Sequence, residues 1–375
     1  MTNWNEITGI FSGIWRRQFG IKSQVSKKCL ESCPPGPSGH AQQTLLIEDE
    51  SLLKRFSLQQ WLEVLRKVTY AIGGVVVFAA FRNSLTWHLE KFWGASGDFW
   101  QSQWGKIYTF FGEDDFAVGF YGTAWVSFLS YWFVCLLFLI IDLTGQPAFI
   151  FKYKIQDDQN IPVPRGKLLH AIAVVLYNQV VVGGPTLLLL YHLMQWRGCS
   201  FGRELPSIYW VMVEAVVFLI FEEIGFYYSH RVFHHPRVYR YIHKIHHEWT
   251  APISVVAIYC HPLEHLFANI LPAVIGPVVM GSHVATLMLW IHVAQTSAII
   301  SHCGYHLPFL PSPEAHDFHH LKFTNNFGTL GILDRLHGTD SLFRQSRQYQ
   351  RHVLLLGLTP VKQAFPDDPK EQKCD

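Results

Sequence analysis

The sequence predicts an all-α fold, a polytopic bundle of transmembrane helices with a histidine-rich cap at one end. Nearly half of the 375 residues (49%) are apolar and only 15% are charged, which is too hydrophobic for an ordinary soluble chain. Several uncharged stretches are also long enough to cross a bilayer as helices. Of the 21 histidines, 15 lie between His230 and His320, next to these apolar stretches.

Charge and cysteine content exclude other classes of protein. The formal net charge is only +2 and the basic residues form no long tract, so no nucleic-acid partner is expected. The 7 cysteines are scattered without a CxxC pair, which indicates reduced thiols. The N-terminus lacks a basic stretch followed by a short apolar core, so we expect no cleaved secretory signal.

Composition divides the chain into four parts. Residues 1–60 form a polar lead-in, which we expect to be cytosolic and partly disordered because the stretch from Cys33 to Gly39 is rich in Pro and Gly. Residues 61–204 hold most of the apolar runs, 205–345 hold the histidines and 346–375 form a polar tail.

Four apolar runs precede the histidines. Val68–Phe81 is uncharged but short for a hydrocarbon core that needs about 20 residues, and we interpret it as the first span. Phe116–Ile141 and Leu168–Trp196 are uncharged over 26 and 29 residues and predict two full spans. Leu205–Phe221 predicts another, whose helix we expect to continue to His230.

The last apolar run predicts a hairpin of two helices. Leu266–Ser301 has no charged residue over 36 positions, which is too long for one span. Helix-breaking residues interrupt it at Pro272, Gly276, Pro277 and Gly281.

Loop charges predict the orientation. Basic residues concentrate in the 144–167 connection and after residue 230, which favours the cytosolic side for both. The acidic 88–117 loop would then lie on the far side. Because the hairpin returns the chain to its starting face, all the clustered histidines should lie on the cytosolic side.

Ten histidines form tight groups with helical spacing. In HRVFH two histidines are four residues apart, and HKIHH and HDFHH each place three at i, i+3 and i+4, so that they share one face of a helix. A single HxxxH pair is weak evidence of a ligand pair, but the joint occurrence of these groups is hard to explain by packing. His302 and His306 form a fourth group. The ten residues are His230, His234, His243, His246, His247, His302, His306, His316, His319 and His320.

This number of imidazoles predicts two metal ions. Ten exceed the four ligands that one structural zinc takes, and the groups lack the cysteine pairs of zinc fingers. Imidazole suits Fe, Cu, Ni and Zn alike, so the ligands alone do not identify the metal. The prediction is therefore an all-α, polytopic transmembrane helical bundle with a cytosolic, histidine-rich di-metal cap.

Acidic residues near the histidines predict supporting roles. Glu223 lies seven residues before His230 and therefore on the same helical face, where it could brace a ligand imidazole. The HPLEH segment matches the H-x-x-E-H pattern of inverted zinc proteases, which leaves a protease as an alternative. We instead expect His261 and Glu264 to hydrogen-bond ligand rings and hold them in the tautomer that binds metal.

These motifs resemble the membrane fatty acid hydroxylase and sterol desaturase superfamily, which is defined by HxxxH, HxxHH and HxxHH boxes. The resemblance covers roughly residues 118–345, including HRVFHH, YIHKIHHEWTAP, HDFHH and LDRLHGTD, and is strongest to the C4-methylsterol oxidase branch. It implies that residues 205–345 are a catalytic domain with two Fe ions, O2 as co-substrate and a cytochrome b5-type electron donor. It also implies residence in the endoplasmic reticulum membrane.

The resemblance also assigns roles to residues. It implies that the histidines of the three boxes ligate iron, with His302 and His306 completing the set, although C4-methylsterol oxidases tend to carry Asp where this chain has His306. Asn326 and Asp334 would shape the site.

The function implied is hydroxylation or oxidation of an unactivated lipid C–H bond, with a C4-methyl sterol in sterol biosynthesis as the first expectation. A fatty acid or sphingoid-chain hydroxylase, and a non-enzymatic membrane scaffold or signalling regulator that retains a structural metal site, are the alternatives.

Overall fold

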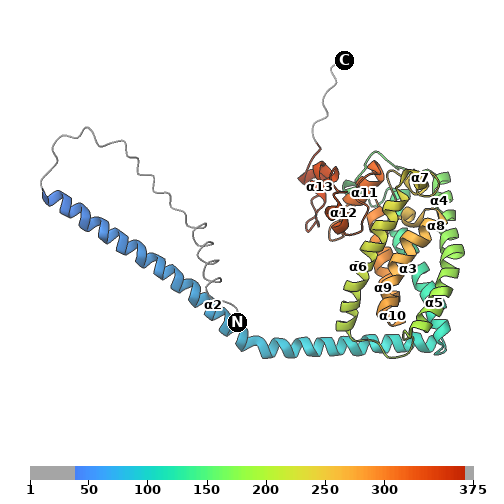
Figure 1. Cartoon of the computed structure of the whole chain (residues 1–375), viewed down its shortest axis with the longest axis horizontal. Coiled ribbons are helices and arrows are strands. Elements are labelled where there is room, and N and C mark those ends of the chain that lie inside the picture. Colours follow the sequence, from blue (N-terminus) through green and yellow to red (C-terminus); the bar gives the residue numbers. More distant parts are fainter. Residues whose placement is uncertain (1–38, 368–375) are drawn as a thin grey trace, which may run out of the picture. The chain divides into compact units, whose positions relative to one another are not determined.

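The computed structural model describes residues 39–367, and these residues are helical with no β-strand, which confirms the predicted all-α fold (Figure 1). The predicted disordered start and the end of the tail lie outside the described residues. The chain divides into two compact units, Met1–Leu89 and Glu90–Asp375, and the second contains all the histidines of the predicted site.

The first described element is longer than the sequence predicts. Helix α2 runs from Gly39 to Phe110, so the described part of the lead-in is helical and most of the predicted 88–117 loop is helix as well. The loop prediction was wrong because Gly94, Gly97 and Asp98 do not interrupt the helix, which ends only before Gly112 (φ +74°). Val68–Phe81 lies within α2, which is not among the candidate membrane spans found in the described residues.

Four described helices are long and apolar enough to cross a membrane, which supports a multi-pass membrane protein. Two of them confirm the predicted second and third spans, and the other two confirm the predicted hairpin, whose turn contains Gly281 in a left-handed conformation (φ +69°). The spans are Ala117–Thr144, Arg165–Arg197, Pro262–Met280 and Val284–His302.

Three of these spans contain a π-helical segment. The first span consists of η1 (Ala117–Gly122) and α3 (Thr123–Thr144). The second consists of α4 (Arg165–Tyr177), η3 (Asn178–Gly183) and α5 (Gly184–Arg197), and the third of α8 (Pro262–Glu264), η6 (His265–Ile270) and α9 (Leu271–Met280). The fourth span is the single helix α10 (Val284–His302).

Helix α6 (Ile208–Phe233) covers the predicted fourth span and ends among the histidines. Its 26 residues rise about 39 Å, enough to cross a bilayer. The run is nevertheless not uncharged, because Glu214 is buried within it, and α6 is not among the candidate spans. It packs closely on α9, where a Cβ added at Gly225 would lie 2.9 Å from Pro272 Cβ.

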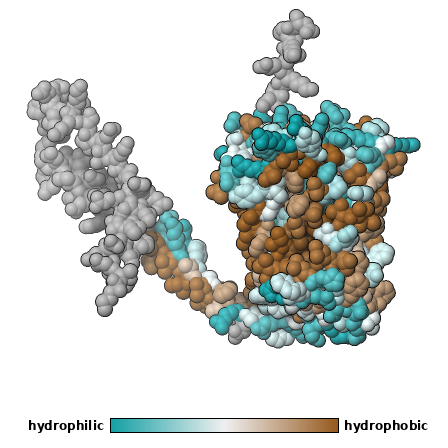
Figure 2. All heavy atoms as spheres, turned by 45° about the vertical axis from the view of Figure 1, so that its right-hand side comes forward, coloured by the Kyte–Doolittle hydropathy of each residue, from teal (hydrophilic) through white to brown (hydrophobic). Residues whose placement is uncertain are grey.

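One end of the bundle is closed by the part of α2 that follows Glu90. Trp104 Nε1 donates a hydrogen bond to the Gly202 carbonyl at 2.9 Å, and His283 Nε2 lies 3.0 Å from the same carbonyl. These contacts join α2, the 198–207 connection and the start of α10. The space-filling view shows an apolar belt between this hydrophilic end and the opposite one (Figure 2).

The opposite end carries a cap of short helices. The 144–165 connection is tied to it, since Gln156 Nε2 donates to the Thr250 carbonyl at 3.0 Å and to the Asp317 carboxylate. Both HxxHH segments therefore lie at the same end as that connection. The cap elements are η2 (Ala148–Tyr153), α7 (Pro236–Tyr239), η4 (His246–Glu248), η5 (Ser254–Ile258), α11 (Glu314–Lys322), α12 (Ile332–His337), η7 (Phe343–Gln345), α13 (Arg347–Arg351) and α14 (Val361–Ala364).

Candidate metal centre

Four segments bring histidines together at the cap end of the bundle. They are the end of α6, the turns that lead into η4, the end of α10 and the short helix α11. The HKIHH segment is not the α-helix that its spacing suggests, but the His247 amide still lies 3.4 Å from the His243 carbonyl, which keeps these two side chains on one side.

Nine of the ten predicted histidines fall into two compact groups. In each group the potential ligand atoms all lie within 4.8 Å of one another. The five-histidine group consists of His230, His234, His243, His247 and His319, and the four-histidine group consists of His246, His302, His316 and His320.

The two groups are adjacent and share their sequence segments. The ring centroids of His247 and His320, one from each group, are 4.8 Å apart. HKIHH gives His246 to the four-histidine group and its other two histidines to the five-histidine group, while HDFHH gives His319 to the latter and its other two to the former. Each HxxHH segment thus contributes to both groups.

The rings approach one another through their Nε2 atoms. In the five-histidine group, His243 Nε2 lies 3.1 Å from His230 Nε2 and 3.0 Å from His247 Nε2. In the four-histidine group, His302 Nε2 lies 3.3 Å from His246 Nε2 and 2.9 Å from His316 Nε2.

Backbone carbonyls fix the other ring nitrogen of five of these histidines. These Nδ1–O distances are 2.8 Å for His230 to Phe327, 3.1 Å for His246 to Tyr259, 2.7 Å for His302 to Ala298, 2.6 Å for His319 to Asn325 and 3.0 Å for His320 to Trp249. A carbonyl can only accept, so each of these Nδ1 atoms carries the ring proton.

This pattern fits bound cations. A neutral imidazole that donates from Nδ1 has a bare lone pair at Nε2, and two bare lone pairs cannot form a hydrogen bond with each other. His246 and His302 are both in this state, yet their Nε2 atoms lie 3.3 Å apart. A metal ion between such nitrogens satisfies both, so the donor set fits a metal in each group.

Burial keeps the rings in the state that a metal requires. Desolvation lowers the pKa of His246 to about 4 and the pKa of His234 to about 2. Burial and the neighbouring rings also lower the pKa values of His243, His247, His316, His319 and His320. At neutral pH these imidazoles are uncharged and can ligate a cation.

The tenth histidine lies in neither group. His306 is fully buried, with Nδ1 3.3 Å from Glu314 Oε1 and Nε2 3.0 Å from the Val353 carbonyl. Its assignment as a ligand came from the family resemblance alone. Helix α10 ends at His302, and Gly304 turns the chain with φ +75° before His306. The geometry therefore does not support His306 as a ligand.

Two predicted supporting residues from HPLEH lie in different places. Glu264 Oε1 is 2.8 Å from His243 Nδ1, so this carboxylate contacts a ring of the five-histidine group and can hold its orientation. His261 instead accepts a hydrogen bond from the Leu263 amide at the start of α8, and within the described part of the chain it belongs to neither histidine group.

Glu223 and Asp334 support the site through a loop and not through a ring. Glu223 accepts hydrogen bonds from the amides of Thr329, Leu330 and Leu333, whereas sequence spacing predicted a contact with an imidazole. Asp334 accepts from the amides of residues 327 and 328. Together they hold the loop whose residue-327 carbonyl accepts from His230.

Asn326 also shapes this loop. Its Nδ2 donates to the Ala315 carbonyl at 2.9 Å, and its backbone is left-handed with φ +59°. The bond ties the loop to α11, one residue before His316.

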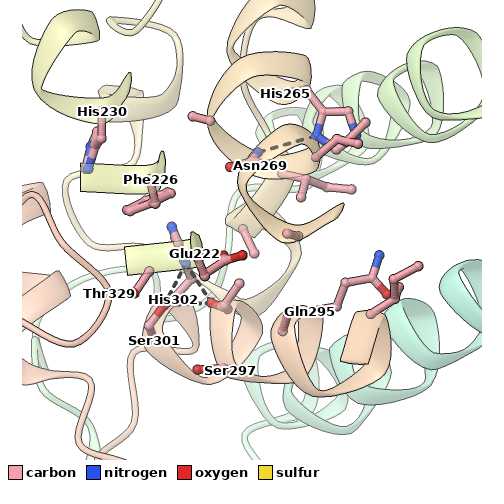
Figure 3. Close-up of a pocket in the computed structure, with 18 of the residues that line it drawn as sticks. Glu222, Phe226, His230, His265, Asn269, Gln295, Ser297, Ser301, His302 and Thr329 are labelled. Carbon is pink, nitrogen blue, oxygen red and sulfur yellow. Dashed lines mark hydrogen bonds between the residues drawn. The ribbon is translucent and has the colours of Figure 1, made fainter. Parts of the chain in front are cut away.

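Sequence reasoning missed the backbone acceptors, because carbonyls carry no residue-type signal. A cavity between the helices reaches the histidines. The cavity has a volume of about 830 Å³, lies between α3, α5, α6, α10 and the η6–α9 helix, and reaches both groups at His230 and His302. Figure 3 shows Glu222, His265, Asn269 and Gln295 among the polar side chains of the wall, which also includes apolar residues of the same helices. The cavity has the size and composition of lipid and small-molecule sites.

Comparison with known proteins agrees with this site. Residues 215–339 match the Fatty acid hydroxylase family model, a range that includes both histidine groups. Fatty acid hydroxylase domain-containing protein 2 of Homo sapiens is 49% identical over 310 residues, which cover 82% of this chain and 93% of that protein.

More distant relatives extend the comparison. Fatty acid hydroxylase ahd1 of Mycosarcoma maydis is 39% identical over 56% of this chain and 54% of its own length. Methylsterol monooxygenase 2-2 of Arabidopsis thaliana is 30% identical over 66% of this chain and 94% of its own length. No solved structure matches the chain. The extent of the first similarity, together with the family match over the histidine-bearing segments, shows that the chain belongs to the fatty acid hydroxylase family.

Proposed function

We propose that this chain is a membrane di-iron, O2-dependent oxygenase that hydroxylates an unactivated C–H bond of a lipid. The observation that carries the proposal is the junction of two adjacent histidine groups with an apolar cavity that opens between membrane-spanning helices. The nine grouped histidines are the proposed ligands. Bound iron would supply the activation of O2, and the protein's part is to hold the ligand rings and to exclude water.

The proposed substrate is a C4-methyl sterol. Support comes from the methylsterol monooxygenases among the relatives that align over nearly their whole length. A fatty acid or sphingoid chain is the second candidate, favoured by the relative named as a fatty acid hydroxylase. Both are bilayer-soluble and fit a cavity reached through spans.

The proposed setting is the endoplasmic reticulum membrane with the histidines facing the cytosol, where a cytochrome b5-type protein would deliver electrons. Basic residues at the histidine end support this orientation. Protease protection of a tag placed after residue 367, in sealed microsomes, tests it. Digestion from outside is expected, and protection would contradict the orientation.

Purified full-length protein tests the reaction. Metal analysis is expected to give two irons per chain, and incubation with electron donor, O2 and a 4-methyl sterol should yield products 16 mass units heavier. An iron-loaded protein that oxidises fatty acids or sphingoid bases but not sterols would establish the second candidate.

Substitution separates the enzyme from a scaffold. His246→Ala and His319→Ala should each abolish turnover because each removes a ring from one group. If the folded variants retain the full cellular effect of the protein, a non-enzymatic scaffold or regulator is the better explanation, and the oxygenase proposal is wrong.

A further inference from the structure

Two neighbouring carboxylates on α6 have opposite surroundings. Glu223 is buried and accepts hydrogen bonds from three backbone amides and from the Thr329 hydroxyl. Glu222 points into the cavity, as Figure 3 shows, and its buried Oε2 has no hydrogen-bond donor among the described residues. A buried carboxyl without a donor is costly, which indicates that the occupant of the cavity supplies one.

Two of the other polar side chains of the cavity wall are engaged with their neighbours. Gln295 donates from Nε2 to Ser127 Oγ at 2.8 Å, and Asn269 Nδ2 lies 3.3 Å from His265 Nδ1. Among the described lining residues, Thr123 Oγ1, Gln179 Nε2 and Glu264 Oε2 are buried without a partner, as Glu222 Oε2 is, and Glu264 already contacts His243 through its other oxygen.

We propose that Glu222 accepts a hydrogen bond from a hydroxyl group of the bound lipid and thereby selects an uncharged alcohol over a fatty acid carboxylate. This inference rests on the proposed lipid oxygenase function and defines its substrate further. An alcohol O–H can donate to the buried Oε2 of Glu222, whereas an ionised fatty acid carboxylate has no proton to donate to it.

The cavity that Glu222 lines also reaches both histidine groups, at His230 and His302. A hydroxyl bound by Glu222 would therefore lie in the same cavity as the C–H bond to be oxidised. A 4-methyl sterol carries these two groups on adjacent ring carbons, because its 3-hydroxyl is on the carbon next to the one that carries the methyl group.

Equilibrium binding to the full-length protein in nanodiscs tests the assignment. The two probes are a radiolabelled 4-methyl sterol with a free 3-hydroxyl and its 3-deoxy analogue. Glu222→Leu should weaken binding of the hydroxyl sterol roughly tenfold to a hundredfold and leave that of the deoxy sterol within about twofold. Glu222→Gln, which keeps an amide oxygen as acceptor, should remain within about fivefold of the wild type.

Glu214→Leu is the matched control. Glu214 lies on the same helix, is buried and has no partner for either carboxylate oxygen, but it does not line the cavity. Its replacement should change the affinity for neither sterol. Monodisperse elution of each variant on size exclusion establishes that it is folded.

The outcomes separate this inference from the reaction itself. Equal weakening of both sterols by Glu222→Leu, absence of sterol binding by the wild type, or equally strong competition by stearate would each overturn the role of Glu222. If the wild type binds the hydroxyl sterol through Glu222 but forms no oxidised product, the proposed reaction fails while the binding role stands.

Discussion

The contrast between His302 and His306 gives the sharpest prediction about the metal ligands. Both lie in one HxxxH motif, but only His302 is within a histidine group, and its Nε2 is 2.9 Å from His316 Nε2. His302→Ala should remove one of four ligands and with it the metal of the four-histidine group. His306→Ala should retain both metals, because His306 contacts Glu314 and a backbone carbonyl instead.

The His306→Ala variant should have a lower free energy of unfolding but an unchanged metal content. The His306–Glu314 pair is fully buried, and Glu314 Oε2 has no hydrogen-bond partner among the described residues. Removing the His306 ring would therefore also deprive Glu314 Oε1 of its contact with His306. Breaking one partner of such a pair costs about 3–5 kcal/mol of unfolding free energy. The His306→Ala/Glu314→Ala double variant should recover part of that loss, because the orphaned carboxyl is gone.

Metal analysis and denaturation of the purified variants provide the assay. The wild type and His306→Ala should carry two metals per chain and His302→Ala about one, while the unfolding midpoint of His306→Ala should fall well below that of the double variant. Loss of one metal from His306→Ala at unchanged stability would refute this reasoning and restore His306 as a ligand.

Three further predictions concern the surroundings of the histidines. Glu264→Gln should weaken metal affinity about 10–100-fold, because this carboxylate lies 2.8 Å from His243 Nδ1, and an unchanged chelator competition curve would contradict that role. Gly328→Ala should destabilise the loop that holds His230 by more than about 1 kcal/mol, since its Cβ would lie 2.9 Å from Glu223 Oε1 and 3.0 Å from Asp334 Oδ2, as chemical denaturation can measure. Metal-free protein should lose stability as the pH falls from 6.5 toward 4, because the unfolded chain protonates His246 at its ordinary pKa of 6.5 while burial lowers the folded pKa to about 4. Equal unfolding free energies at pH 7 and pH 5 would contradict this linkage.

Sequence patterns predicted most of the histidine site because the relevant information is carried by residue type and spacing. The i, i+3 and i+4 positions of HDFHH do share a helix, and nine of the ten clustered histidines converge. His306 lies in neither group although it is only four residues from His302, because α10 ends at His302 and helical spacing does not continue beyond it.

Other features depend on tertiary contacts that a pattern does not carry. The face shared by Glu223 and His230 suggested a direct contact, but the carboxylate is closer to a loop more than a hundred residues away, at Thr329 and Leu330. The carbonyls that orient the rings belong to residues of no common type. Helical phase predicts which residues are neighbours on one helix, and it does not predict what packs against them.

The division of each HxxHH segment between the two groups has a consequence for how the centre is assembled. A cation bound by one group would fix HKIHH and HDFHH in place, and these same segments carry rings of the other group. Binding of the first ion would account for most of the entropy lost when these segments become ordered, so the second ion should bind more tightly. Molecules with a single ion should therefore be scarce when metal-free protein is titrated with metal. A binuclear centre built in this way should fill cooperatively when all nine rings are present.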